Sequence, residues 1–137
     1  MSGSRDRSIM TWKIDQGLLK TRQEAHSRTL TSVRIYQGYV FSSSRDRSVK
    51  IWDLLSLESL QILSGTHKHS VWGIDVRNDQ LITSSADKSL NVWRKDLNTN
   101  LWNFKFKLDN NESLRHVIIL KKAPHLALSG KPLCLLF

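Results

Sequence analysis

An Asp–Trp pattern recurs three times along this chain of 137 residues, and it constrains the fold more than any other feature. The three copies span residues 2–12, 42–52 and 83–93, and in each an Asp lies six positions before a Trp: Asp6 and Trp12, Asp46 and Trp52, Asp87 and Trp93. A His keeps the same phase, since His26 and His67 each lie 20 residues before the Asp of their copy. A period of 40 or 41 residues is typical of architectures that repeat one structural unit.

Each complete unit contains four short runs in which apolar and polar residues alternate. The runs are residues 30–36, 39–43, 49–52 and 60–63 in one unit, and 71–76, 80–83, 90–93 and 101–106 in the next. Alternation with enrichment in β-branched and aromatic residues is typical of half-buried strands, and turn-prone pairs such as Gln37-Gly38 separate the runs. We find no sustained helical periodicity, so the sequence predicts an all-β fold of four-stranded antiparallel units.

These residues resemble the WD40-repeat (β-transducin-like) family. Trp52-Asp53 reproduces its Trp-Asp ending, which varies at Trp12-Lys13 and Trp93-Arg94, and its Gly-His marker stands here as Ala25-His26 and Thr66-His67. The resemblance covers residues 2–106 and implies an incomplete WD40 β-propeller built of four-stranded antiparallel blades. Its expected parts are the C-terminal part of a blade (1–24), two complete repeats (25–64 and 65–108) and a partial or aberrant blade or tail (109–137).

The last segment fits the repeat poorly. Residues 115–120 and 125–130 are candidates for two further strands, whereas residues 131–137 resemble no blade element. Propellers close with about four to eight blades, so this number of units is too small to close a ring alone. We expect the chain to be part of a longer protein with the missing blades, to self-associate with other copies, or to be a poorly stable product.

The recurring His, Asp, Ser and Trp residues also match the composition of a hydrolase site. A catalytic triad needs an exposed nucleophile, one base and an oxyanion hole, but here the set occurs twice without a nucleophile elbow. The resemblance instead implies a structural hydrogen-bond chain in each blade. Its members would be Trp52, Ser42 or Ser44, His26 and Asp46 in one blade, and Trp93, Thr83 or Ser85, His67 and Asp87 in the next. The two hydroxyl residues of each blade share a strand face, so both remain candidates.

Lys and Arg number 21 against 12 Asp and Glu, which gives a formal charge of +9 and favours anionic partners. The resemblance places several basic residues and one tryptophan on a single face of the propeller. These partner-binding candidates are Arg5, Arg7, Arg28, Arg45, Arg47, Lys68, Trp72 and Lys88. Arginines on one face suit capture of phosphate or carboxylate, whereas the alternative is a solvated turn in which Arg balances Asp. Trp72 is a candidate contact or a packing residue, Trp12, Trp52 and Trp93 are expected to pack, and the role of Trp102 stays open.

We therefore expect a non-catalytic protein-interaction scaffold without a cofactor or a metal, since His67-Lys68-His69 has no Cys or acidic cluster beside it. Its basic face resembles the F-box/WD propellers of ubiquitin-ligase adaptors, which bind acidic or phosphorylated segments, although no F-box helical region is present. The alternative is charge-driven binding of nucleic acid or anionic lipid, with nucleic acid the less favoured partner, and a hydrolase is a distant third. The lone Cys134 and the absence of a signal sequence or membrane span suggest an intracellular protein, cytoplasmic or nuclear.

Overall fold

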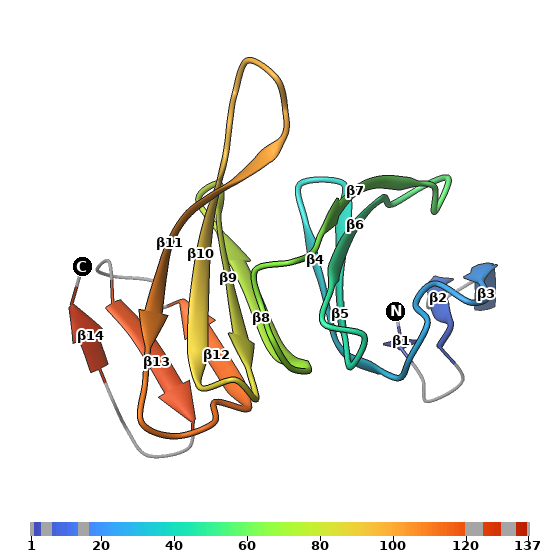
Figure 1. Cartoon of the computed structure of the whole chain (residues 1–137). Coiled ribbons are helices and arrows are strands. Elements are labelled where there is room, and N and C mark those ends of the chain that lie inside the picture. Colours follow the sequence, from blue (N-terminus) through green and yellow to red (C-terminus); the bar gives the residue numbers. More distant parts are fainter. Residues whose placement is uncertain (1, 4–6, 14–16, 120–124, 130–133, 137) are drawn as a thin grey trace.

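The computed structural model describes residues 2–3, 7–13, 17–119, 125–129 and 134–136. Within these ranges the regular structure consists of antiparallel strands, and no residue lies in a helix. The strands form four sheets that follow one another in space in chain order, with the N-terminal and C-terminal sheets at opposite ends of the row (Figure 1).

Each sheet is a meander in which sequential strands pair. The first sheet contains β1 (Ser2–Gly3), β2 (Ile9–Lys13) and β3 (Gly17–Arg22). The second contains β4 (Leu30–Tyr36), β5 (Tyr39–Ser44), β6 (Val49–Asp53) and β7 (Ser59–Leu63). The third contains β8 (Val71–Arg77), β9 (Gln80–Ser85), β10 (Ser89–Lys95) and β11 (Trp102–Asp109). The fourth contains β12 (His116–Ile119), β13 (His125–Ser129) and β14 (Cys134–Leu136).

A two-residue turn joins the first two strands of the second sheet, and another joins the first two strands of the third. These turns set the register of the strands. Gln37 and Gly38, between β4 and β5, have φ angles of 47° and 79°, and Asn78 and Asp79, between β8 and β9, have φ angles of 49° and 56°. Positive φ at both central residues is the mark of a type I′ turn, whose twist matches that of the strands it joins. Glycine, asparagine and aspartate are the residues that adopt this conformation at the lowest cost.

The apolar core lies between neighbouring sheets. Phe41 and Ile51 of the second sheet share one cluster with Ile74, Trp93 and Trp102 of the third. Two further clusters join the other sheets, with Ile9, Val40 and Trp52 between the first and second, and Ile82, Val92, Leu114 and Val117 between the third and fourth. A sheet therefore has both faces buried only when a neighbouring sheet packs on each side of it, as in a stacked repeat.

Polar contacts join the innermost strands β4, β8 and β12. Asp75 of β8 lies between the other two strands, because its Oδ1 is 3.6 Å from Arg34 Nε and its Oδ2 accepts the Ile119 backbone N–H at 2.6 Å. Gly73 of β8 lies directly against the chain entering β12, since a Cβ there would be 2.9 Å from the Arg115 carbonyl oxygen. The inner strands thus pack at a spacing that admits no side chain at position 73.

The prediction of an all-β fold built from four-stranded antiparallel units is confirmed in the second and third sheets. The structure also has strands in the expected segments 115–120 and 125–130. Residues 131–137 resemble no blade element in sequence, but residues 134–136 form β14, which pairs with β13. Hydrophobic alternation is too short in this segment to reveal a three-residue strand.

Candidate functional site

A chain of buried hydrogen bonds crosses the second sheet. Trp52 Nε1 donates to Ser42 Oγ at 2.8 Å, His26 Nε2 lies 2.8 Å from the same oxygen, and His26 Nδ1 lies 2.8 Å from Asp46 Oδ2. An indole N–H can only donate, so Ser42 is free to donate its own proton to Nε2, which leaves the imidazole proton on Nδ1 facing the carboxylate. Every member of the chain is then paired with the imidazole neutral.

The third sheet repeats this arrangement with longer bonds at its two ends. Trp93 Nε1 lies 3.4 Å from Thr83 Oγ1, His67 Nε2 lies 2.8 Å from that oxygen, and His67 Nδ1 lies 3.3 Å from Asp87 Oδ2. Asp87 also accepts bonds from the Ser89 hydroxyl and the Lys68 backbone N–H. The turn that carries each Asp is thereby tied to the segment that carries each His.

Ser44 and Ser85, the other hydroxyl candidates, do not contact the histidines in the hydrogen bonds of the described residues. Ser44 Oγ donates to the Thr29 carbonyl at 3.0 Å, and Ser85 Oγ donates to the Ser70 carbonyl at 2.9 Å. Each of these hydroxyls also accepts the backbone N–H of the turn Asp. They hold the turns against the segments leading into β4 and β8.

The hydrogen bonds at these sites shift the acidity of the buried groups. Burial alone would raise the pKa of Asp46, but the bonds from His26 and Ser48 outweigh it and hold that pKa far below the ordinary 3.8. Burial would likewise raise the pKa of Asp87, but the hydrogen bonds from Ser89 and Lys68 outweigh this effect and lower that pKa to about 2. Burial lowers the pKa of His67, and the nearby Asp87 only partly counters it. Both carboxyl groups are thus ionised near neutral pH.

The geometry of these sites does not suit acyl transfer. The Ser42 and Thr83 side chains are 0% exposed, and each hydroxyl oxygen already lies within bonding distance of an indole N–H. A triad nucleophile has to reach the substrate carbonyl next to an oxyanion hole. A hydroxyl enclosed between two sheets offers no such approach.

The turns that carry the aspartates also present basic side chains to solvent. A pocket of about 450 Å³ opens where the second and third sheets meet, and its lining is polar. Its lining residues are Ser27, Arg28, Arg45, Asp46, Arg47, Lys68, His69 and Ser70. We call this the basic pocket, because Arg28, Arg45, Arg47 and Lys68 surround a single carboxylate. Four of the eight partner-binding candidates are therefore brought together.

Trp72 lies beside this pocket, half-buried at the start of β8. The guanidinium carbon of Arg45 is 5.1 Å from the centre of its ring, and that of Arg115 is 6.0 Å away. Sequence reasoning missed Arg115, which directly precedes β12 in a segment without the Asp–Trp pattern. Its position gave one signal: Arg115 directly follows the apolar Leu114, as Trp72 directly follows the apolar Val71 on the neighbouring inner strand.

The remaining candidates lie elsewhere. Arg7 pairs with Glu24 at 3.4 Å, Lys88 is exposed but does not line the basic pocket, and Arg5 is outside the described residues. Trp102, whose role was left open, is a core residue at 2% exposure. The side chain of Trp12 lies outside the described part of the chain.

Among the residues described, no three His, Cys, Asp or Glu side chains gather as metal ligands would. A helix of sufficient length and apolarity to cross a membrane is likewise not found there.

Four-stranded meanders packed face to face, with the same Trp-to-Asp hydrogen-bond chain repeated in successive sheets, define blades of a β-propeller. The family model described as "WD domain, G-beta repeat" matches residues 17–53 and 57–94. The chain belongs to the WD40-repeat family, whose members generally act as protein-interaction scaffolds.

Similar proteins agree with this assignment. A WD repeat-containing protein of Schizosaccharomyces pombe is 28% identical over 84% of this chain and 29% of its own length. Eukaryotic translation initiation factor 3 subunit I of Eremothecium gossypii is 37% identical over 50% of this chain and 21% of its own length. The crystal structure of the RRP9 WD40 repeats superposes with a TM-score of 0.82 at 23% identity, covering 93% of this chain and 40% of that one. The chain thus spans less than a third of these two relatives, and the structural likeness concerns the fold.

Proposed function

We propose that this chain is a non-catalytic interaction scaffold whose basic pocket binds acidic or phosphorylated segments of partner proteins. The observation that carries the proposal is the basic pocket itself, where Arg28, Arg45, Arg47 and Lys68 line one open cavity. Guanidinium groups donate paired hydrogen bonds that fit carboxylate and phosphate oxygens. Cations from two blades around one cavity favour a compact anionic group rather than a long polyanion.

Trp72 and Arg115 extend this surface toward the inner strands. A cation that lies over an indole face is already ordered in the free protein. Binding of a ligand to that cation then costs less side-chain entropy. Arg45 both lines the basic pocket and lies over Trp72, so the ring supports one of the ligand-binding guanidinium groups. A bound segment that contacts the pocket would therefore also lie against this aromatic side chain.

The two hydrogen-bond chains serve this surface indirectly in our proposal. Asp46 accepts the Ser27 backbone N–H at 3.1 Å, and Asp87 accepts the Lys68 backbone N–H at 2.7 Å. These bonds fasten the segments that carry Arg28 and Lys68 to the turns beside them. We assign His26, Ser42, Trp52 and their counterparts in the third sheet a structural role of this kind, without catalysis.

An intracellular location, cytoplasmic or nuclear, belongs to the same proposal. It is supported by a relative that is named as a translation initiation factor subunit.

The proposal is tested by titrating the full chain with a short acidic peptide that carries one phosphothreonine, and with the same peptide lacking the phosphate. Replacing Arg45 and Arg47 by Glu should weaken binding of the phosphopeptide about tenfold or more, since each charge-assisted bond contributes roughly 1.5–3 kcal/mol. The control is Arg22→Glu, because Arg22 is exposed on β3 and does not line the basic pocket.

Two results would contradict the proposal. One is unchanged phosphopeptide affinity in the Arg45→Glu, Arg47→Glu variant with an intact β-sheet circular dichroism spectrum. The other is binding of single-stranded oligonucleotides or anionic vesicles that exceeds peptide binding and falls steeply with salt regardless of sequence, which would favour the charge-driven alternative.

A further inference from the structure

The lining of the basic pocket includes a histidine, His69, on the segment between β7 and β8. Its side chain is exposed and lies between the neighbouring lining residues Lys68 and Ser70 in the chain. His26 and His67, in contrast, are buried and bonded within the two hydrogen-bond chains. Among the hydrogen bonds and ion pairs of the described residues, the imidazole of His69 has no partner. Its ring nitrogens are therefore free to bond a ligand in the pocket.

The internal repeat equates His69 with Arg28. Each lies two positions after the histidine of its hydrogen-bond chain. Ser44 Oγ donates to the Arg28 carbonyl at 3.1 Å, and Ser85 Oγ donates to the His69 carbonyl at 3.2 Å, so the two backbones are held in the same way. Both side chains line the basic pocket, one from each of two neighbouring repeats. One repeat position thus supplies a permanently charged side chain in one blade and a titratable one in the next.

The charged groups around His69 belong to types that keep their charge near neutral pH. Four cationic side chains line the cavity with it: Arg28, Arg45, Arg47 and Lys68. The carboxylate in the lining is Asp46, whose pKa lies far below the ordinary 3.8 because His26 and Ser48 bond it. The β9–β10 turn, which Ser85 ties to the His69 carbonyl, carries Lys88 and Asp87, and hydrogen bonds lower the pKa of Asp87 to about 2. Protonation of an imidazole is therefore the change in charge that this lining undergoes between pH 8 and pH 6.

We propose that His69 is a further anion-binding residue of the basic pocket, and that it makes the affinity for acidic or phosphorylated segments increase as the pH falls below neutral. This inference rests on the proposed function of that pocket. A neutral imidazole donates from one nitrogen, whereas the protonated ring donates from both and adds a positive charge. Charge-assisted hydrogen bonds to carboxylate or phosphate are stronger than neutral ones. The anion therefore binds the protonated form more tightly, and by linkage a bound anion favours protonation.

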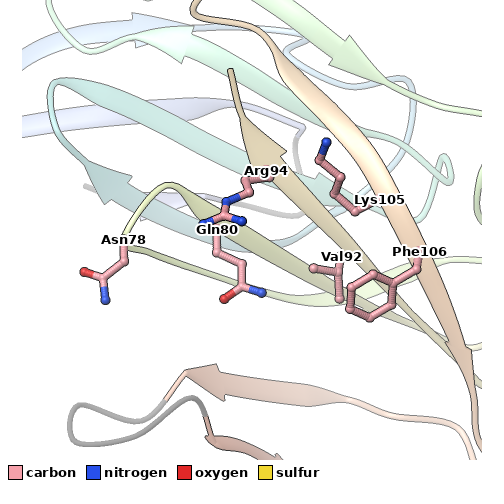
Figure 2. Close-up of a pocket in the computed structure, with 6 residues that line it drawn as sticks. All are labelled: Asn78, Gln80, Val92, Arg94, Lys105 and Phe106. Carbon is pink, nitrogen blue, oxygen red and sulfur yellow. The ribbon is translucent and has the colours of Figure 1, made fainter. Parts of the chain in front are cut away.

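A second pocket, on the third sheet, provides an internal reference for this effect. Its volume is about 580 Å³. Figure 2 shows its lining residues, which are Asn78, Gln80, Val92, Arg94, Lys105 and Phe106. This lining has two cationic side chains but, among the described residues, neither a histidine nor a carboxylate. Attraction of an anion to Arg94 and Lys105 should therefore not change between pH 8 and pH 6.

The test uses nuclear magnetic resonance to measure binding to the full chain, labelled with ¹⁵N, at pH 8 and at pH 6. The probe is a short glycine–serine peptide with blocked ends and one central cysteic acid. Its sulfonate keeps its charge over this range, whereas a phosphate has a second pKa near 6. The Lys68 amide signal should report an affinity about fivefold higher at pH 6 than at pH 8. The side-chain amide signals of Asn78 and Gln80 should show no such increase.

Two substitutions at position 69 have opposite expected results. His69→Gln should bind the probe at both pH values as weakly as the wild type does at pH 8. His69→Arg introduces the residue found at the matching position 28, and it should bind at both pH values at least as tightly as the wild type does at pH 6. The matched control is His116→Gln, because His116 is exposed on β12 and does not line the basic pocket. This control should keep the wild-type dependence on pH.

Two results would overturn this inference while leaving the proposed function in place. One is wild-type binding of equal affinity at pH 8 and pH 6, and the other is an increase toward pH 6 that persists in His69→Gln. Circular dichroism at both pH values verifies that each variant is folded. A folded wild-type chain whose Lys68 signal responds to the probe at neither pH would overturn the proposed function of the pocket as well.

Discussion

The side-chain amide of Gln61 pairs with the backbone of Trp102 as a neighbouring strand would. Its Nε2 donates to the Trp102 carbonyl at 2.9 Å, and its Oε1 accepts the Trp102 N–H at 2.8 Å. The two residues are 41 positions apart and belong to the outer strands β7 and β11. One side chain thus satisfies two backbone groups at the junction of two blades, while the Trp102 ring fills the core beneath them.

Loss of this amide should weaken the junction. We expect Gln61→Ala to lower the free energy of unfolding by about 1–3 kcal/mol, because both backbone groups of Trp102 lose their partner. Urea denaturation measures the change. The control is Leu60→Ala on the same strand, which removes a side chain that is 51% exposed and should cost less. Equal effects of the two substitutions would show that the paired bonds add no stability.

The two hydrogen-bond chains should differ in strength. The Trp52–Ser42 bond is 2.8 Å long, whereas Trp93 Nε1 lies 3.4 Å from Thr83 Oγ1. A double-mutant cycle of Trp52→Phe with Ser42→Ala should give a coupling energy of about 1 kcal/mol, and the cycle of Trp93→Phe with Thr83→Val a smaller one. Stronger coupling in the third sheet would contradict this reading of the distances.

Acid should destabilise the protein in two steps. The folded-state pKa of His67 lies below 6.5, so the unfolded chain binds more protons as the pH falls through that value, and stability declines. A second decline should follow between pH 3.8 and about 2, where Asp87 is protonated only in the unfolded chain, and Asp46 acts in the same direction. Urea midpoints measured from pH 7.5 to about pH 2 would show both steps.

His67→Gln separates the two contributions to acid sensitivity. It should remove the decline near pH 6 while preserving the one below pH 4, since the carboxylates remain. A wild-type stability that stays constant from pH 7 to pH 5 would refute the role of His67.

The close approach of β8 and β12 should make position 73 intolerant of a side chain. A Cβ on Gly73 would lie 2.8 Å from Ser84 Oγ, 2.9 Å from the Arg115 carbonyl and 3.1 Å from His116 Cα. Two of these atoms belong to backbone, so the fourth sheet has to shift, and we expect Gly73→Ala to cost about 1–3 kcal/mol. The Ile119 amide, which donates to Asp75, should exchange its hydrogen faster, and amides of β5 should not. Unchanged exchange at Ile119 would exclude this steric account.

Much of the fold follows from short-range patterns in the sequence. Alternation predicted segment 30–36 at the bounds of β4, and segments 71–76 and 101–106 close to those of β8 and β11. Such patterns do not say whether Ser42 or Ser44 meets His26, because both lie on one strand face. The choice depends on how far the His segment reaches along β5, which is a tertiary property.

The residues around the basic pocket differ in how far they could be predicted. Arg45 and Arg47 could be placed with Lys68 because a repeat carries equivalent residues to one face. Arg115 could not, since its place beside Trp72 depends on how the fourth sheet packs, and the Asp–Trp pattern stops before that sheet. The environment of Asn91 could not be predicted from the sequence either. Its side chain is buried and has no hydrogen-bond partner within the structure described. The equivalent repeat position in β6 is Lys50, whose ammonium group donates to the Ala25 carbonyl.

The inner strands also determine how a disturbance spreads through the molecule. Because β4 packs on β8 and β8 on β12, the sheets behave as a linear series of units in which each is stabilised by its neighbours. The second and third sheets each have a partner on both faces and should retain their amide protons longest, with exchange accelerating toward both ends of the series. The basic pocket lies where the second and third sheets meet, so a ligand bound there would contact residues of both. Occupancy there should slow exchange in the second and third sheets more than in the first or fourth.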